Sequence, residues 1–413
     1  MVLGGKRIND AVKQRVIAFN RTNDRYRIVL REYAYDENTN SYPQLNNDIA
    51  SGNMPDILVA EGLPVDRYIE KGLIADLRPL IKQDEELSEA EFMENVFETY
   101  SVDGKLMYVI PDFMVDTVVA KTSTVGDGAD WSLEKVKQLL AEMDQRTQFM
   151  SEMTRDMFME AAMSFYGNEF LEMETGKCSF ESDEFIALMK FAATLPKEID
   201  FDTLYDGDDY WDDYEAQYRD ERTLLLELRI DSLNRSLNYQ LNGYMGEDYI
   251  FVGFPGSGVE SGKGAYIYGN NLMVLSSKSK MLEGAWEFAR YYLTDEYQEG
   301  LDWGLPVNKK IFLEKAEKLT EHMVRIDENG TEVESDDTLY YHGEDVPVMP
   351  MTQSQLEQFV AYVESVKGTS FADEEILRII GEEMEAFFAG DKTAEESAKL
   401  IQNRVQLYMN ERN

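Results

Sequence analysis

The sequence of 413 residues contains one cysteine and two histidines, and these shortages exclude several kinds of site. A single thiol, Cys178, can form neither an internal disulfide nor a cysteine-built metal site. With only His322 and His342, a histidine-rich metal centre and a nucleophilic triad both lack support. We therefore expect no catalytic residue, no metal and no cofactor.

Long apolar runs and positive charge are also scarce. No run approaches the roughly 18 apolar residues of a membrane-spanning helix. The N-terminus has no basic stretch followed by an apolar one, so we expect that an export signal is absent from the sequence as given. Eighty Asp and Glu residues against forty Lys and Arg give a formal net charge of −40. Such a surface repels phosphate, which makes nucleic acids and anionic membranes unsuitable partners.

What the sequence does contain is enough apolar material for a large folded protein. Hydrophobic residues make up 43% of the chain, with 20 Phe and 24 Tyr, so the acidity does not indicate disorder. A chain of 413 residues exceeds what one hydrophobic core usually organises. We expect two lobes.

Strands and helices alternate in the first hundred residues. Apolar and β-branched runs predict strands at 2–3, 26–33 and 56–60, and helical spacing predicts helices between them, the later two ending at Gly52 and Gly72. Parallel strands need helical crossovers, so this order favours a mostly parallel sheet covered by helices. Ligands then gather at the carboxyl ends of the strands.

Beyond Pro111 the chain becomes richer in helices. The α/β pattern resumes with a predicted strand at 272–275, and the last hundred residues are predicted to be helical. Thr352 with Gln355, and Thr393 with Glu396, have the spacing of capping boxes and predict two helix starts.

Two loops resemble known motifs only superficially. The stretch 256–264 departs from the nucleotide-binding P-loop at Ser257 and Gly264. The acidic run 206–213 lacks the order of ligands in a calcium-binding loop, and we interpret it as a solvated loop.

Six segments in a fixed order resemble the family 1 extracellular solute-binding proteins, the group that includes the maltose-binding protein. They occupy residues 14–20, 49–58, 72–77, 103–111, 284–288 with 297–298, and 304–308. Their sequences include Gly52-Asn53-Met54-Pro55-Asp56-Ile57 and Gly304-Leu305-Pro306-Val307-Asn308. Each segment alone is a weak indication of the family, but six segments in the right order over 300 residues are a strong one.

The resemblance implies an α/β, two-lobed periplasmic-binding-protein-like fold with three crossover segments, known as type II. Residues 1–112 and 268–303 would form lobe 1, and residues 113–267 and 304–413 would form the helix-rich lobe 2. The ligand would lie in the cleft between the lobes, which close on it by a hinge motion.

The same resemblance implies a component of an ABC importer that captures a sugar or oligosaccharide and delivers it to the permease subunits in the membrane. The ending 398–411 is similar to that of lipoprotein members from Gram-positive gut bacteria. We therefore expect a monomer on the extracellular face of the membrane, tethered through a lipidated cysteine in the full-length protein.

A sugar offers hydroxyl groups and apolar C–H faces, so its site needs hydrogen-bonding side chains and aromatic surfaces. Loops after predicted strands, and the expected crossovers, supply candidates of these types. The predicted ligand-binding residues are Arg7, Glu61, Gly62, Asp112, Phe113, Arg155, Tyr166, Asp231, Asn234, Tyr268, Asn270 and Trp303. Each could instead be an ordinary turn, core or hinge residue, and the family's stacking tryptophan has no counterpart near Asp231.

Two other functions stay open at the level of sequence. A glycoside hydrolase or other carbohydrate-active enzyme could hide a carboxylate pair among eighty acidic residues without any motif. An adhesion or scaffold protein would need no closing cleft. The order of the strands and helices, and the resemblance, favour solute capture.

Overall fold

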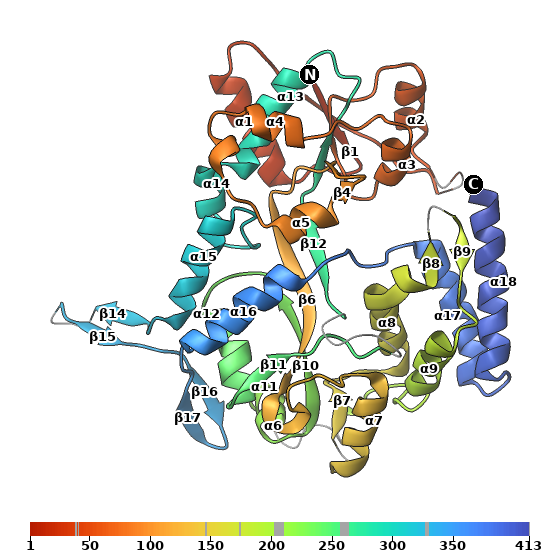
Figure 1. Ribbon diagram of the computed structural model, residues 1–413, viewed down its shortest axis with the longest axis vertical. Coiled ribbons are helices and arrows are strands. Elements are labelled where there is room, and N and C mark those ends of the chain that lie inside the picture. Colours follow the sequence, from red (N-terminus) through yellow and green to blue (C-terminus); the bar gives the residue numbers. More distant parts are fainter. Residues whose placement is uncertain are drawn as a thin grey trace. The chain divides into compact units, whose positions relative to one another are not determined.

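The chain forms two compact units, each built from segments that lie far apart in the sequence. In the computed structural model, unit 1 comprises Met1–Met114 and Gly269–Lys315, and unit 2 comprises Val115–Tyr268 and Ala316–Asn413 (Figure 1). The structure describes residues 1–37, 39, 41–144, 147–172, 175–201, 210–256, 264–326 and 330–412. Within these ranges, no helix is long and apolar enough to cross a membrane.

The chain passes between the units three times, after Met114, Tyr268 and Lys315. The sequence predicted crossings after residues 112, 267 and 303. In the structure the first two crossings come two residues and one residue later, and the third comes twelve residues later, within α15 (Lys309–Glu317). Of the two loops that resemble motifs superficially, residues 257–263 and 206–209 lie outside the described residues. Residues 210–213 begin helix α11 (Tyr210–Arg219), so this part of the acidic run is not a loop.

Unit 1 contains a four-stranded sheet in the order β13-β3-β1-β2. Its strands are β1 (Val2–Gly5), β2 (Val29–Glu32), β3 (Ile57–Val59) and β13 (Met273–Leu275). The helices of this unit are α1 (Asp10–Thr22), α2 (Pro43–Ala50), α3 (Val65–Glu70), α4 (Arg78–Gln83), α5 (Glu94–Thr99), α13 (Leu282–Ala289), α14 (Asp295–Glu299) and α15, with 3-10 turns η1 (Leu87–Glu89) and η3 (Arg290–Leu293). A small hairpin joins β4 (Ser101–Val102) to β5 (Lys105–Leu106).

The predicted alternation of strands and helices is present in this unit. Strand β1 pairs in parallel with β2 and β3, and only β13 runs antiparallel. Helix α1 begins where the sequence predicted, because the Asn9 side chain accepts a hydrogen bond from the Val12 amide. The helices cover the sheet with apolar residues. Phe19 of α1 packs edge-on against Phe288 of α13, and Leu45 of α2 belongs to a separate buried cluster.

Unit 2 is larger and its main sheet is mixed, in the order β11-β6-β10-β7 with β12 also paired to β6. These strands are β6 (Asp112–Lys121), β7 (Gln148–Met150), β10 (Thr223–Ile230), β11 (Tyr249–Phe251) and β12 (Tyr266–Asn270). The long helices are α7 (Leu133–Glu142), α8 (Arg155–Phe170), α9 (Asp183–Ala192), α11 (Tyr210–Arg219), α16 (Gln353–Ser365), α17 (Glu374–Phe388) and α18 (Ala394–Arg412).

Shorter elements complete unit 2. They are α6 (Thr122–Val125), α12 (Arg235–Asn238), the π-helical turn η2 (Tyr239–Tyr244), the 3-10 turn η4 (Lys318–Thr320), and three hairpins, β8 (Leu171–Glu172) with β9 (Lys177–Cys178), β14 (Val324–Ile326) with β15 (Glu332–Glu334), and β16 (Thr338–Tyr341) with β17 (Glu344–Pro347). Both predicted capping boxes are confirmed at the starts of α16 and α18.

Strand β6 organises the core of unit 2 because all ten of its residues are buried. Its side chains alternate between the two faces of the sheet. Val118 and Ala120 belong to the large apolar cluster that includes residues of α8, α9, α17 and α18. On the opposite face the Thr117 and Tyr362 hydroxyls share a hydrogen bond, which ties β6 to α16.

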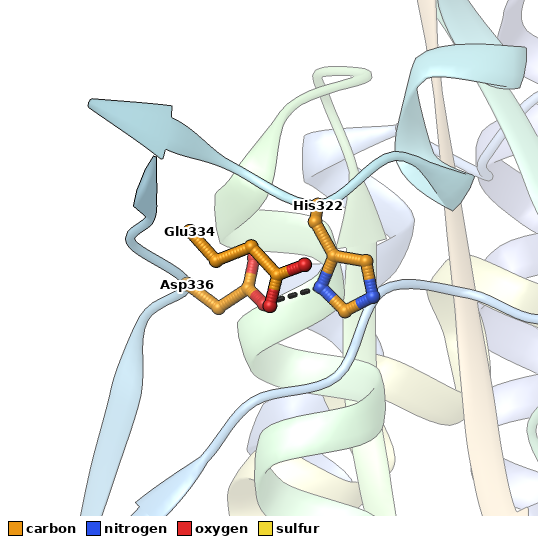
Figure 2. A group of neighbouring side chains, drawn as sticks. All are labelled: His322, Glu334 and Asp336. Atoms are coloured by element: carbon orange, nitrogen blue, oxygen red, sulfur yellow. Dashed lines mark hydrogen bonds and ion pairs between the residues drawn. The ribbon is translucent and has the colours of Figure 1, made fainter. Parts of the chain in front are cut away.

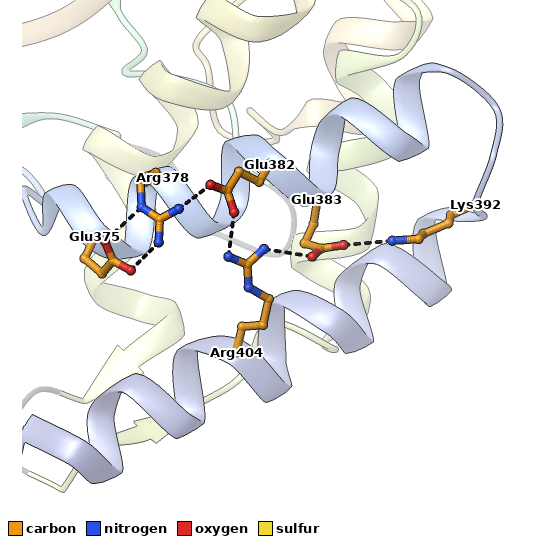
Figure 3. Close-up of polar contacts among 6 residues, drawn as sticks. All are labelled: Glu375, Arg378, Glu382, Glu383, Lys392 and Arg404. Atoms are coloured by element: carbon orange, nitrogen blue, oxygen red, sulfur yellow. Dashed lines mark hydrogen bonds and ion pairs between the residues drawn. The ribbon is translucent and has the colours of Figure 1, made fainter.

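Helices α17 and α18 are joined by a network of ion pairs (Figure 3). Arg404 of α18 contacts Glu382 at 2.5 Å and Glu383 at 2.8 Å, and Lys392 also contacts Glu383 at 2.9 Å. Burial raises the pKa of Glu383, but its two cationic partners more than offset this and hold that pKa below its usual value. The network fixes how the two C-terminal helices align.

Two helical glycines of unit 2 give a matched test of this packing. A Cβ at Gly167 of α8 would lie 2.3 Å from the ring of buried Phe371, whereas a Cβ at Gly381 of α17 meets nothing within 4 Å. Gly167→Ala should therefore destabilise the protein by about 1–3 kcal/mol through overpacking. Gly381→Ala should stabilise it by about 0.5–1 kcal/mol, since alanine favours the helix. Chemical unfolding of both variants tests this, and equal effects would contradict the packing of α8 against Phe371.

Candidate functional site

The strand pair β6–β10 changes from apolar to polar along one face. In their antiparallel register Val118 lies opposite Glu227, and Asp116 lies opposite Arg229. Residues opposite each other point to the same face of the sheet, so Asp116, Glu227 and Arg229 share one face. Val118 and Leu225 lie on this same face and are buried in the apolar cluster. Three charged side chains thus gather at the end of a hydrophobic strand face.

A pocket of about 380 Å³ opens at this polar end. Its lining residues come from β6, β7, β10 and α11, and they are Asp116, Met150, Ser151, Tyr214, Tyr218, Glu227 and Arg229. Strands β7 and β10 run parallel, so Ser151 and Arg229 mark carboxyl ends at the same edge of the sheet. This is the part of an α/β sheet where ligands bind.

The Asp116 carboxylate dominates the electrostatics of the pocket. Arg229 Nε donates a hydrogen bond to Asp116 Oδ1 at 2.8 Å. The Asp116 side chain is 7% exposed, and its Oδ2 is buried without a hydrogen-bond partner among the residues that the structure describes. Burial raises the pKa of Asp116, although Arg229 and, after it, the nearby Tyr266 hydroxyl act in the opposite direction. A buried acceptor without a donor is costly and favours a ligand that supplies one.

The remaining walls provide a second acidic group and aromatic surface. Desolvation in the pocket, and then the charge of Asp116, raises the pKa of Glu227. Tyr214 and Tyr218 lie one turn apart on α11 with their rings edge to face, 6.3 Å between centroids. The pocket therefore combines carboxylates and a guanidinium with tyrosine rings, a set suited to a neutral ligand that bears hydroxyl groups.

Several of the predicted site residues lie in unit 1. Arg7 and Glu61 are exposed in the turns that follow β1 and β3, and Gly62 lies against Lys6 with its carbonyl accepting from the Tyr42 hydroxyl. These turns meet because β1 and β3 are adjacent parallel strands.

The residues predicted near the crossovers form a second group. Asp112 is 2% exposed, receives a hydrogen bond from the Asn270 side chain, and packs its Oδ1 against Gly304, where φ is +85°. The neighbouring Trp303 is 58% exposed, and Tyr268 is also exposed. Phe113 is fully buried and exchanges two backbone hydrogen bonds with Leu305.

The predicted residues of unit 2 do not line the polar pocket. The Arg155 guanidinium lies over the Phe388 ring, 4.3 Å from its centroid, and the buried Tyr166 hydroxyl donates to the Phe254 carbonyl. Asn234 caps α12, and the Asp231 carboxylate accepts from Ser232. The side chains that line this pocket include Asp116, Glu227, Arg229 and the α11 tyrosines. Arg155, Tyr166, Asp231 and Asn234 remain proposed ligand contacts.

These features define a class of protein. Two α/β units linked by three chain crossings, with a polar pocket at the strand ends, are the architecture of two-lobed solute-binding proteins. The chain belongs to a family described as bacterial extracellular solute-binding protein, whose model matches residues 14–322. Members of this family are extracellular binding proteins rather than enzymes, and we assign this protein to that class.

Solved structures of similar fold extend over nearly the whole chain. They include an ABC substrate-binding protein from Listeria monocytogenes in complex with cycloalternan, which is 16% identical with a TM-score of 0.52, covering 99% of this chain and 98% of that chain. A cyclic alpha-maltosyl-1,6-maltose binding protein from Arthrobacter globiformis is 13% identical with a TM-score of 0.54 and the same coverage. The sugar-binding protein MalE from Xanthomonas citri is 12% identical with a TM-score of 0.54, covering 100% and 98%. No curated protein sequence matched the chain.

The environment of Asp112 predicts a dependence of stability on pH. Burial raises the pKa of Asp112 from 3.8 to about 7, and the Asn270 hydrogen bond lowers it only in part. Between these pH values the folded protein holds a proton that the unfolded chain releases, so stability falls as pH rises through this window. Asp112→Asn replaces the carboxyl group with an amide that stays neutral, so this position no longer binds or releases a proton.

The melting temperature of Asp112→Asn relative to the parent should therefore increase from about pH 4 to about pH 7 and stay constant above it. Thermal melts across this range measure the difference. A difference that does not change with pH would contradict the raised pKa, whatever its absolute size.

Proposed function

We propose that the protein captures a sugar or short oligosaccharide and delivers it to the membrane permease of an ABC importer. The observation that carries this proposal is the polar pocket of unit 2, with its buried Asp116 Oδ2, in a chain of the solute-binding family. The sugars named for the Listeria and Arthrobacter proteins of similar fold support the same class of ligand.

The chemistry of the pocket suits a sugar better than a charged solute. A hydroxyl group can donate to Asp116 Oδ2 while it accepts from the guanidinium of Arg229, which a carboxylate ligand or a simple cation cannot do. Tyrosine rings offer flat surfaces for the apolar face of a pyranose. The net charge of −40 further disfavours anionic solutes.

The two carboxylates of the pocket, Asp116 and Glu227, are proposed as hydroxyl acceptors rather than as an acid and a nucleophile. Solute-binding proteins release their ligand unchanged. Incubation with the bound oligosaccharide, followed by chromatography of the sugar, separates the two roles, because a hydrolase would release shorter products.

The residues predicted in unit 1, including Arg7, Glu61, Asp112, Asn270 and Trp303, remain proposed ligand contacts. The lipid anchor and the monomeric state are proposals too, supported by the resemblance to lipoprotein members of the family. Light scattering of the purified protein tests the monomer, and labelling of the full-length protein with a fatty-acid analogue in cells tests the anchor.

Calorimetric titration against a panel of α-linked and β-linked oligosaccharides tests the proposed ligand class. We expect at least one glycan to bind, and Asp116→Asn and Arg229→Met to weaken that binding by about 10-fold or more, since each removes a charge-assisted hydrogen bond. Glu227→Gln should have a smaller effect, because Glu227 is less buried by surface area than Asp116.

Arg25→Met is the matched control for Arg229→Met, because it breaks an ion pair with Glu283 on the exposed surface of unit 1. Its affinity for the glycan should equal that of the parent. Glycan binding that survives both pocket substitutions would place the ligand elsewhere, and the absence of binding across the panel would contradict the proposed ligand class.

A further inference from the structure

A cluster of three potential metal ligands lies outside the polar pocket, at the base of the β14–β15 hairpin (Figure 2). His322, Glu334 and Asp336 each offer one ligand atom, and these atoms all lie within 4.8 Å of one another. Figure 2 shows the carboxylates of Glu334 and Asp336 pointing toward the same edge of the His322 ring. The distance from His322 Nδ1 to Asp336 Oδ2 is 2.5 Å.

The register of the hairpin explains why the three residues meet. Val324 pairs with Glu334, so continuing the ladder sets His322 opposite Asp336. Side chains two apart in a strand share a face, which puts Glu334 on the same side as Asp336. The sequence alone does not reveal this cluster, because its residues meet through a cross-strand pairing.

Backbone contacts hold the base of the hairpin in place. The Ser335 amide donates to the Met323 carbonyl, and the Met323 amide donates to Asp336 Oδ1, both at 2.7 Å. This leaves Asp336 Oδ2 directed at the His322 ring. A cavity of about 170 Å³ adjoins the cluster, with Asp336 and Met323 in its wall, and gives space for solvent beside the ligands.

The types and spacing of the donor atoms select a class of ion. An ion with ligand bonds of about 2.0–2.2 Å holds donor atoms at most about 4.4 Å apart, so shifts of less than about 1 Å would bring all three into one coordination sphere. Two carboxylates balance a divalent charge. The imidazole nitrogen favours Zn²⁺ and related transition metals over Mg²⁺ and Ca²⁺, which prefer oxygen ligands.

We propose that His322, Glu334 and Asp336 form a binding site for a divalent transition-metal ion of the Zn²⁺ type. The ion takes the place of the His322–Asp336 hydrogen bond and links the two strands at the base of the hairpin. Water completes its coordination, because the His322 side chain is 42% exposed. This inference is independent of the proposed sugar ligand.

Titration of the purified protein with ZnCl₂ by calorimetry tests the proposal, with His322→Ala, Asp336→Asn and Glu334→Gln as site variants. His342→Ala is the matched control. His342 is the other histidine of the sequence, is also exposed, and contacts the carboxylate of Asp220. We expect one saturable site per chain in the parent and in His342→Ala. Affinity should be at least about 10-fold weaker in His322→Ala, as loss of even a supporting residue weakens metal sites by that factor.

A visible absorption spectrum with Co²⁺ provides a second readout, which non-specific binding of cations to the acidic surface would not give. The parent and His342→Ala should show a bound-Co²⁺ band that His322→Ala lacks. Equal Zn²⁺ affinity for His322→Ala and His342→Ala, equal affinity of the parent for Ca²⁺ and Zn²⁺, or no saturable Zn²⁺ binding would each overturn the proposal. Melting curves measured beside the titrations show whether each variant is folded. Glu334→Gln keeps the His322–Asp336 contact, so it removes one metal ligand without disturbing that hydrogen bond.

Discussion

The candidate site depends on the burial of one carboxylate, that of Asp116. A charged group removed from water destabilises the fold unless a counter-charge and hydrogen bonds replace its solvation. The antiparallel register of β6 and β10 supplies the counter-charge, because it sets Arg229 directly opposite Asp116. The Arg229 guanidinium donates to Oδ1, and Oδ2 has no hydrogen-bond donor within the part of the chain that the structure describes. Asp116 therefore lines the pocket with a carboxylate whose second oxygen has no donor among the described residues.

This arrangement requires the rigid apolar surroundings of the strand pair. Val118 and Leu225, one step further along the same face, are packed against the helices of the large apolar cluster. Because the interior is close-packed, it resists shifts of the strand pair. A site that is already ordered loses little conformational entropy when the ligand binds, and preorganised pockets gain affinity in this way.

Much of the fold could be predicted from the sequence. Helical and strand periodicity located the alternating elements of unit 1, and local capping chemistry at Asn9, Thr352 and Thr393 fixed three helix starts. The mixed sheet of unit 2 was harder, because antiparallel pairing between β6 and β10 joins residues more than a hundred positions apart. Periodicity reports which face a residue occupies but not which strand lies beside it.

The same limit explains the candidate site. The predicted residues come mainly from loops after strands and from the crossovers, whereas the pocket is lined mainly by side chains within β6 and β10 and on α11. A signal was present, since Asp116 interrupts an apolar strand, and Glu227 and Arg229 alternate with leucines. Their proximity became apparent only with the register. The hairpin cluster of His322, Glu334 and Asp336 was missed for the same reason.

A crystal structure of the protein with its tightest-binding oligosaccharide tests the central claim most directly. The distance that matters runs from Asp116 Oδ2 to the nearest hydroxyl oxygen of the sugar. The account predicts a hydrogen bond of about 2.5–3.0 Å, with Arg229 still paired to Oδ1. A sugar bound elsewhere, with only solvent beside Asp116 Oδ2, would contradict it.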